Sequence, residues 1–169
     1  MDLGTIFDLI SAFALVTGLV FALIQLRQYR ASRKREAAFV LLHSFTTPSF
    51  NKGMHLISKL PEGLSVSELE KVVDSNAELM YSLMTTWESL GILVCRGEVS
   101  LDLVDDFFSG AIAVSWRKLQ PHVDHVRKQV KRDTWAEWFQ WLAERMMERE
   151  TDSRPIPAYI EHREWKPRD

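Results

Sequence analysis

Arg117 and His122 are the two side chains whose types and spacing most suggest a reaction. A histidine can move a proton near neutral pH, and a guanidinium can stabilise the negative charge that develops on a phosphoryl group. Both lie at the start of residues 117–132, a stretch with six basic side chains and the single acid Asp124. Because arginine is abundant in the chain, a pair with this spacing is also expected by chance. Only the residues around the pair can indicate whether it forms a catalytic site.

The Arg117 to His122 element is similar to the active motif of HEPN-type ribonucleases, which lies at a helix junction in an α-bundle. The resemblance implies that two protomers bring their motifs together and cleave RNA without a metal ion. His122 would then move protons, and Arg117 would hold the charge of the phosphorane. Residues 36–169 carry more acidic than basic side chains, so we expect nucleic acid as a partner only if this ribonuclease alternative holds.

No metal site and no cofactor are predicted. His122 and His125 can share a helix face, but a metal ion needs further ligands, and only Asp105 and Asp106 are nearby by type. The chain has no phosphate-binding glycine loop, nucleophile elbow or paired-cysteine motif. Its single cysteine, Cys95, cannot form an intrachain disulfide and is expected to be a small buried core residue.

An uncharged segment near the N-terminus is expected to position the rest of the chain. Residues 9–26 read LISAFALVTGLVFALIQL, a length close to that of a membrane-spanning helix. A cleaved signal peptide would carry positive charge before its apolar run, whereas here only Asp2 and Asp8 precede it. A buried core helix of this length is rarely apolar on every face. We therefore expect a single transmembrane helix.

A basic cluster follows the apolar segment and predicts its orientation. The cluster consists of Arg27, Arg30, Arg33, Lys34 and Arg35. The positive-inside rule places it in the cytoplasm and the N-terminus outside, which predicts a single-pass protein of the inner (cytoplasmic) membrane. Its side chains are also expected to bind anionic lipid headgroups, so membrane lipid is a predicted partner.

One face of the predicted membrane helix carries only small or mildly polar side chains. Ala14, Gly18 and Ala22 recur every four residues, and Ser11 and Gln25 fall on the same side at about 100° per residue. Small residues let helix backbones approach closely, so this face predicts a homo-oligomer. An oligomeric membrane pore lined by the face is a further alternative.

The fold class predicted for the whole chain is all-α, with the N-terminal transmembrane helix extended into a cytoplasmic helical bundle. The expected divisions are the extracytoplasmic N-terminus and membrane helix (1–26), a basic juxtamembrane stalk that continues the helix (27–46), the bundle (47–150) and an extended C-terminal tail (151–169). No segment shows the alternation that is typical of strands.

Local signals predict where the helices of the bundle begin and end. Thr47 before Pro48 predicts a helix to about residue 60, Ser65 with Glu68 predicts the next start, and Gly97 the next end. This second helix should carry one long heptad-like seam: Leu69, Val73, Asn76, Met80, Leu83, Trp87, Leu90 and Val94.

Two more helices are expected after Gly97. Ser100 should cap the first, which Pro121 is expected to interrupt, and Asp133 or Thr134 should cap the second.

The sequence from Trp87 onward reads WESLGILVCRGEVSLDLV, then WRKLQPHV and WAEWFQWLA. Together with an N-terminal span followed by arginines, this pattern resembles a family of uncharacterised bacterial membrane-anchored proteins, defined only as a domain of unknown function. The resemblance implies a membrane location and a helical cytoplasmic domain, and it supplies no catalytic residues. In this pattern Gly91 and Gly97 look like turn and cap positions, and Trp87 and Trp116 like core anchors.

These patterns favour a membrane-anchored helical protein that acts through self-association or by docking a partner protein. They identify no reaction, and the HEPN-like ribonuclease and the pore remain the alternatives.

Overall fold

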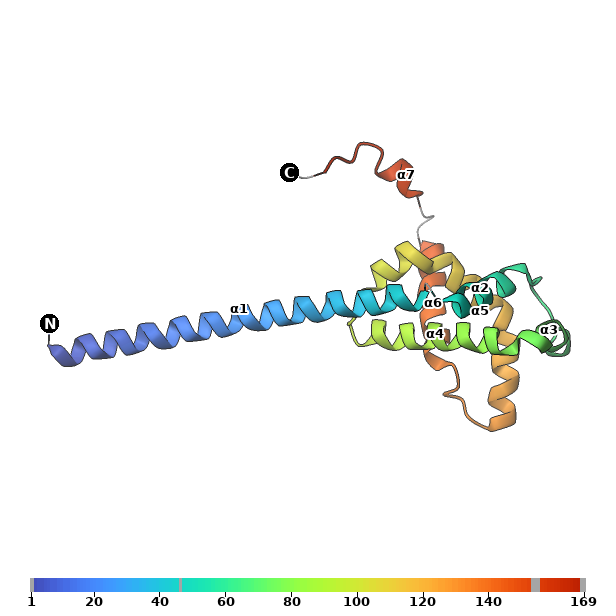
Figure 1. Cartoon of the computed structure of the whole chain (residues 1–169), viewed down its shortest axis with the longest axis horizontal. Coiled ribbons are helices and arrows are strands. Elements are labelled where there is room, and N and C mark those ends of the chain that lie inside the picture. The colour runs from blue at the N-terminus through green and yellow to red at the C-terminus, as the bar shows by residue number, and fades with distance from the viewer. Residues whose placement is uncertain (1, 46, 153–155, 168–169) are drawn as a thin grey trace. The chain divides into compact units, whose positions relative to one another are not determined.

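The computed structural model describes residues 2–45, 47–152 and 156–167. Within the first helix it describes the whole backbone but only part of the side chains, including those of residues 13–29. All described elements are helices, so the all-α class is confirmed for this part of the chain (Figure 1). They are α1 (Leu3–Phe45), α2 (Pro48–Lys59), α3 (Val66–Val73), the 3₁₀ helix η1 (Asp74–Asn76), α4 (Ala77–Cys95), α5 (Leu101–Val130), α6 (Glu137–Asp152) and α7 (Ala158–Glu161).

The chain divides into two compact units, Met1–His43 and Ser44–Asp169. The first consists of most of α1, a single helix of 43 residues that is about 65 Å long at 1.5 Å per residue. The expected continuation of the apolar helix through the basic cluster is therefore confirmed. In the described part of the chain, no helix contains a stretch that is both long and apolar enough to cross a membrane.

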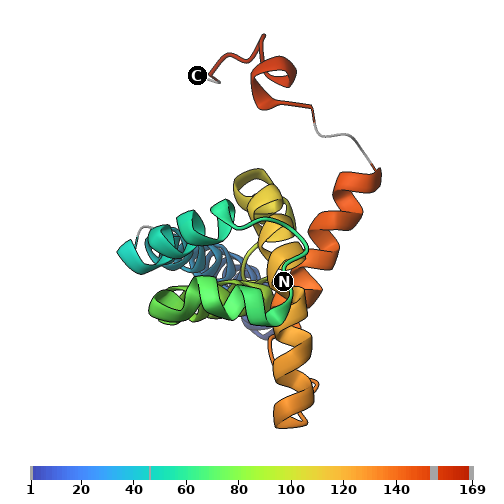
Figure 2. The ribbon, with the colours of Figure 1, turned by 90° about the vertical axis from the view of Figure 1, so that its right-hand side faces the viewer.

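The second unit is a helical bundle. In it α4 packs against α2 and α6, while α5 packs against α2, α3 and α6 (Figures 1 and 2). Every apolar member of the predicted seam is buried, which confirms the seam as part of the core. The seam does not lie on one helix, however, because η1 separates α3 from α4. The Asp-Ser-Asn sequence explains this break, since these short polar side chains compete with the helical backbone for hydrogen bonds.

Four aromatic rings from different elements meet in the core. Phe45 lies against Phe50 and Phe108, with ring centroids 4.9 Å and 3.9 Å away, and Phe50 and Phe108 both contact Trp87. Phe45, expected at the end of the stalk, is therefore part of the bundle core. The predicted core anchors Trp87 and Trp116 are confirmed, with exposed fractions of 0% and 3%.

The helix caps that depend on neighbouring residues form as predicted. Phe50 N donates to the Thr47 hydroxyl at 3.3 Å, and Ser65 and Glu68 exchange both bonds of a capping box. The hydrogen bonds from Ser65 lower the pKa of the Glu68 carboxyl. Gly97, with φ of 69°, ends α4: Glu98 N donates to Leu93 O and Gly97 N to Val94 O, as in a Schellman motif. Ser100 caps α5 by accepting from Leu103 N at 3.0 Å.

Two predicted boundaries are wrong. Pro121 does not interrupt its helix, since α5 continues to Val130. Proline removes the N–H that would bond the carbonyl of Arg117, and its ring crowds that carbonyl, but tertiary packing overrides both costs. The last long helix, α6, begins at Glu137 rather than after Asp133 or Thr134.

The start of α6 has a cap from another helix. Phe139 N, in its first turn, donates to the Glu88 carboxylate of α4 at 2.7 Å. Ala136, directly before the helix, has a φ of 55° and accepts from Gln140 N. A free first-turn N–H is thus satisfied by a side chain about fifty residues away in sequence, which no local pattern predicts.

Gly91 is not a turn residue but lies buried within α4, four residues before the helix ends, where the backbone of α6 passes. A Cβ atom at this position would overlap with the carbonyl oxygen of Trp138 and lie 2.8 Å from its carbonyl carbon. Gly53 of α2 is equally constrained, since its Cβ would lie 2.6 Å from the carbonyl oxygen of Leu79 in α4. The close packing of α4 with α2 and α6 therefore requires glycine at these two points.

We expect Gly91→Ala to lower the free energy of unfolding by about 1–3 kcal/mol, because the added methyl group forces α4 and α6 apart. The matched control is Gly110→Ala in α5, which is exposed and would place its methyl group in open space, with no atom within 4 Å. The free energy of unfolding of this control should rise by about 0.5–1 kcal/mol, because alanine has a higher helix propensity than glycine. Urea unfolding of both full-length variants, followed by far-UV circular dichroism, measures the difference. Equal stability of the two variants would contradict the close approach.

Candidate functional site

Arg117 and His122 both lie on α5, but the structure does not bring their side chains together. His122 follows Arg117 by five positions, so at about 100° per residue the side chains leave the helix about 140° apart. The Arg117 side chain is 41% exposed, whereas His122 is 4% exposed. Their hydrogen-bonding partners belong to different parts of the bundle.

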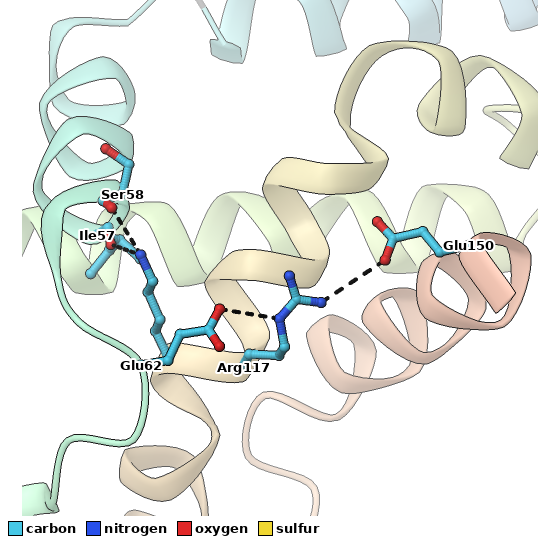
Figure 3. A network of polar contacts seen from close by, with 6 residues as sticks. Ile57, Ser58, Glu62, Arg117 and Glu150 are labelled. Carbon is cyan, nitrogen blue, oxygen red and sulfur yellow. Dashed lines mark hydrogen bonds and ion pairs between the residues drawn. The ribbon is translucent and has the colours of Figure 1, made fainter. Parts of the chain in front are cut away.

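Arg117 bridges two carboxylates. Its Nε lies 3.4 Å from Glu62 in the loop after α2, and its Nη1 lies 3.9 Å from Glu150 near the end of α6 (Figure 3). The guanidinium therefore joins α5 to two segments that are distant in sequence. Because it is already paired with two acids, it is poorly suited to hold a phosphate in this arrangement.

Lys118, the next residue, is buried and caps another helix. Its ammonium group donates to the carbonyl oxygens of Ile57 at 3.1 Å and Ser58 at 2.8 Å (Figure 3). These carbonyls belong to the last turn of α2, where the helix dipole favours a positive charge. Lys118 thus serves the fold and is not available to bind an external anion.

Arg127 also acts inside the bundle. Its Nε donates to the carbonyl of Trp135 at 2.8 Å and its Nη1 to the amide oxygen of Gln140 at 2.6 Å. It therefore fastens the loop between α5 and α6. Within residues 117–132, three of the six basic side chains thus hold the bundle together, and the expected anion-binding surface is correspondingly reduced.

His122 occupies a buried aromatic site. Its Nε2 lies 3.3 Å from the Tyr81 hydroxyl, and the rings of Tyr81 and Trp135 contact the imidazole edge-on. Its Nδ1 is buried and has no hydrogen-bond partner among the described residues. Burial lowers the pKa of His122; the Glu70 carboxylate opposes this shift and His125 adds to it.

This arrangement can accept or pass on a proton, since a neutral imidazole contacts a tyrosine hydroxyl. It lacks an adjacent cation for charge stabilisation, because Arg117 points to Glu62 and Glu150. Among the described side chains, no group of three or more metal-ligating residues lies close enough to hold a metal ion. Asp105 instead pairs with Arg149 at 3.1 Å. The ribonuclease alternative therefore stays an untested prediction.

The predicted membrane face is only partly described. Ala14, Gly18, Ala22 and Gln25 are exposed on α1, and nothing lies within 4 Å of a Cβ built on Gly18. The side chain of Ser11 lies outside the described residues.

The basic cluster is described still less completely. Arg27 is exposed, and the side chains of Arg30, Arg33, Lys34 and Arg35 lie outside the described ones. Cys95, expected to be buried, is instead exposed in the last turn of α4.

A groove in the bundle is the feature that sequence reasoning missed. It has a volume of about 530 Å³ and lies between α2 and the segment from α3 to α4; we call it the α2 groove. A signal was present in the sequence, because four lining residues of α2 recur at helical spacing. The lining consists of Lys52, His55, Leu56, Lys59, Leu60, Pro61, Val72, Asn76 and Leu79.

We expect the buried His122 to make stability depend on pH. Its pKa in the folded protein lies below the unfolded value of about 6.5, so the unfolded state takes up the proton first. Burial of the neutral imidazole therefore contributes fully to the free energy of unfolding above a pH of about 6.5. This contribution is lost as the pH falls through the lowered pKa of the folded protein. Unfolding titrations between pH 7.5 and 5 should show a smaller loss of stability in His122→Gln than in the unmodified protein. His125→Gln is the matched control and should lose nearly as much stability over this pH range as the unmodified protein. An equal loss of stability in all three proteins would contradict the effect of burying His122.

Comparison with known proteins gives a family without an assigned activity. The model of the domain of unknown function DUF4760 matches residues 12–146, which include most of α1 and the helices from α2 to the middle of α6. No curated protein and no solved structure matches the chain. The chain belongs to the DUF4760 family.

Proposed function

We propose that this protein is a single-pass membrane protein whose helical bundle lies on the cytoplasmic side and acts through self-association or by docking a partner protein. One observation carries the proposal: large apolar side chains project from most of the circumference of α1. Nine of them are 47–77% exposed: Phe13, Leu15, Val16, Leu19, Val20, Phe21, Leu23, Ile24 and Leu26.

The distribution of these side chains favours lipid as their environment. At about 100° per residue they cover roughly 240° of the helix, far more than the stripe by which a surface helix packs on a core. Transfer of each from water to an apolar phase is worth about 1.5–3 kcal/mol. A bilayer supplies such a phase along the whole segment.

The polar groups of the segment are compatible with this environment. The Thr17 hydroxyl donates to the carbonyl of Phe13 at 2.8 Å, so it needs no partner outside the helix. The proposed span covers residues 9–26, of which the side chains of residues 9–12 lie outside the described ones. Arg27 and the basic residues after it would then meet the headgroups of the cytoplasmic leaflet.

The sector of α1 without large side chains supports self-association. It contains Ala14, Gly18, Ala22 and Gln25, which leave room for a second helix to approach. The bulky sector would face lipid, and the small sector would face another copy. The α2 groove offers the bundle a separate surface for a protein partner.

Arginine at the centre of the proposed span should release the protein from the membrane. Each arginine there costs about 2.5–3.5 kcal/mol on insertion scales, so Leu15→Arg/Leu19→Arg should move much of the protein into the supernatant on alkaline carbonate extraction. The unmodified protein should stay in the pellet. So should the control Phe107→Arg/Val130→Arg, which places the same charges at two exposed apolar positions of the bundle. Extraction of the unmodified protein by carbonate would refute the anchor.

A bulky side chain at Gly18 should weaken self-association. We expect Gly18→Leu to raise the dissociation constant in detergent micelles about tenfold, in line with the 1–2 kcal/mol typical of membrane helix contacts. Val20→Leu, which enlarges a side chain in the bulky sector, is the matched control and should change little. Light scattering with size-exclusion chromatography measures the oligomer. A strictly monomeric unmodified protein, or an unchanged Gly18→Leu, would remove self-association through this face from the proposal.

A further inference from the structure

The α2 groove has an apolar floor and a cationic rim. Leu56, Leu60, Val72 and Leu79 supply the floor, and Val72 is 53% exposed although it is apolar. Lys52 and Lys59 of α2 supply the positive charges of the rim, and His55 lies between them in sequence. Such a surface selects a short apolar segment that carries negative rather than positive charge beside its apolar side chains.

The C-terminal segment, residues 156–167, presents apolar side chains of this kind. Its large apolar residues are Ile156, Tyr159, Ile160 and Trp165, with exposed fractions of 62%, 74%, 48% and 70%. The short helix α7 has the sequence AYIE, so its only charged side chain is Glu161, whereas the residues after it carry Arg163, Glu164 and Lys166. A helix of four residues is not stable alone in water, and it gains stability by packing its apolar side against a surface.

The C-terminal segment is tethered near the groove. Arg117 contacts both Glu150, close to the end of α6, and Glu62, which directly follows the groove residue Pro61 (Figure 3). Residues 153–157 separate α6 from α7. A chain of this length spans up to about 20 Å, so the tether lets α7 reach the groove of its own bundle.

We propose that α7 docks into the α2 groove of the same chain. Tyr159 and Ile160 would cover the apolar floor, and Glu161 would face the cationic rim. Docking removes two uncovered apolar surfaces from water at once. It also makes the tail an intramolecular cover, which a partner protein would have to displace to bind in the groove.

Disulfide trapping in the full-length protein tests this arrangement. Val72→Cys and Ile160→Cys are combined in a Cys95→Ser background, and the thiols are oxidised with copper phenanthroline. Both positions are exposed, so the substitutions should not disturb folding, which far-UV circular dichroism checks. We expect a monomeric product with an internal disulfide, identified by its faster migration on a non-reducing gel and by mass spectrometry of the linked peptides.

Two controls make the result specific. The pair Gly110→Cys/Ile160→Cys places the first thiol at an exposed site on α5 outside the groove and should give at least fivefold less internal disulfide. Adding Lys59→Glu to the groove pair should reduce the yield severalfold by reversing a rim charge, whereas adding Lys128→Glu should not.

Three outcomes would overturn the proposal: a disulfide-linked dimer, which assigns the groove to the tail of a second copy; equal yields from the two cysteine pairs; or no product at all.

Discussion

The apolar side chains that surround α1 between Phe13 and Leu26 impose the constraint on which the rest of the account depends. They cover too much of the helix to be buried by packing along one stripe, and this breadth is the basis for the lipid environment that we propose for them. The uninterrupted helix and the hydrogen bond from Thr17 to its own backbone are both compatible with that proposed environment. In the proposed arrangement, the basic residues that follow would lie at the lipid headgroups.

The bundle, by contrast, has its own core and is specified by tertiary contacts. Glycines at positions 53 and 91 let the backbones of α2 and α6 touch α4. Two charged side chains satisfy helix ends in distant elements: Lys118 at the end of α2 and Glu88 at the start of α6. Such contacts use charges that would otherwise be available at the surface. This is why the basic stretch of α5 contributes more to the fold than to binding an anion.

Features that depend on neighbouring residues could be predicted from the sequence. The caps at Thr47, Ser65 and Ser100 and the end at Gly97 are local, and all four form. Buried seam positions followed from helical periodicity. The break at η1 has a local cause in the Asp-Ser-Asn sequence that the heptad-like spacing hid. The continuation through Pro121 and the start of α6 could not be predicted, because tertiary packing decides both.

The candidate site was harder to predict than the fold. The sequence predicted a helix junction at Pro121, between Arg117 and His122, and it could not show that the two side chains leave one continuous helix on different sides. The α2 groove escaped notice because only its α2 wall has a sequence pattern. Its other wall comes from residues that approach α2 only after the bundle has folded.

The topology of the bundle tests the central claim most directly. Cys95 is the single cysteine of the chain and is exposed, so it can be labelled without further substitutions. A membrane-impermeant maleimide should label it in inverted membrane vesicles but not in intact cells of a bacterial expression host, and Cys95→Ser should abolish the signal. Labelling in intact cells, or recovery of the protein outside the membrane fraction, would contradict the account.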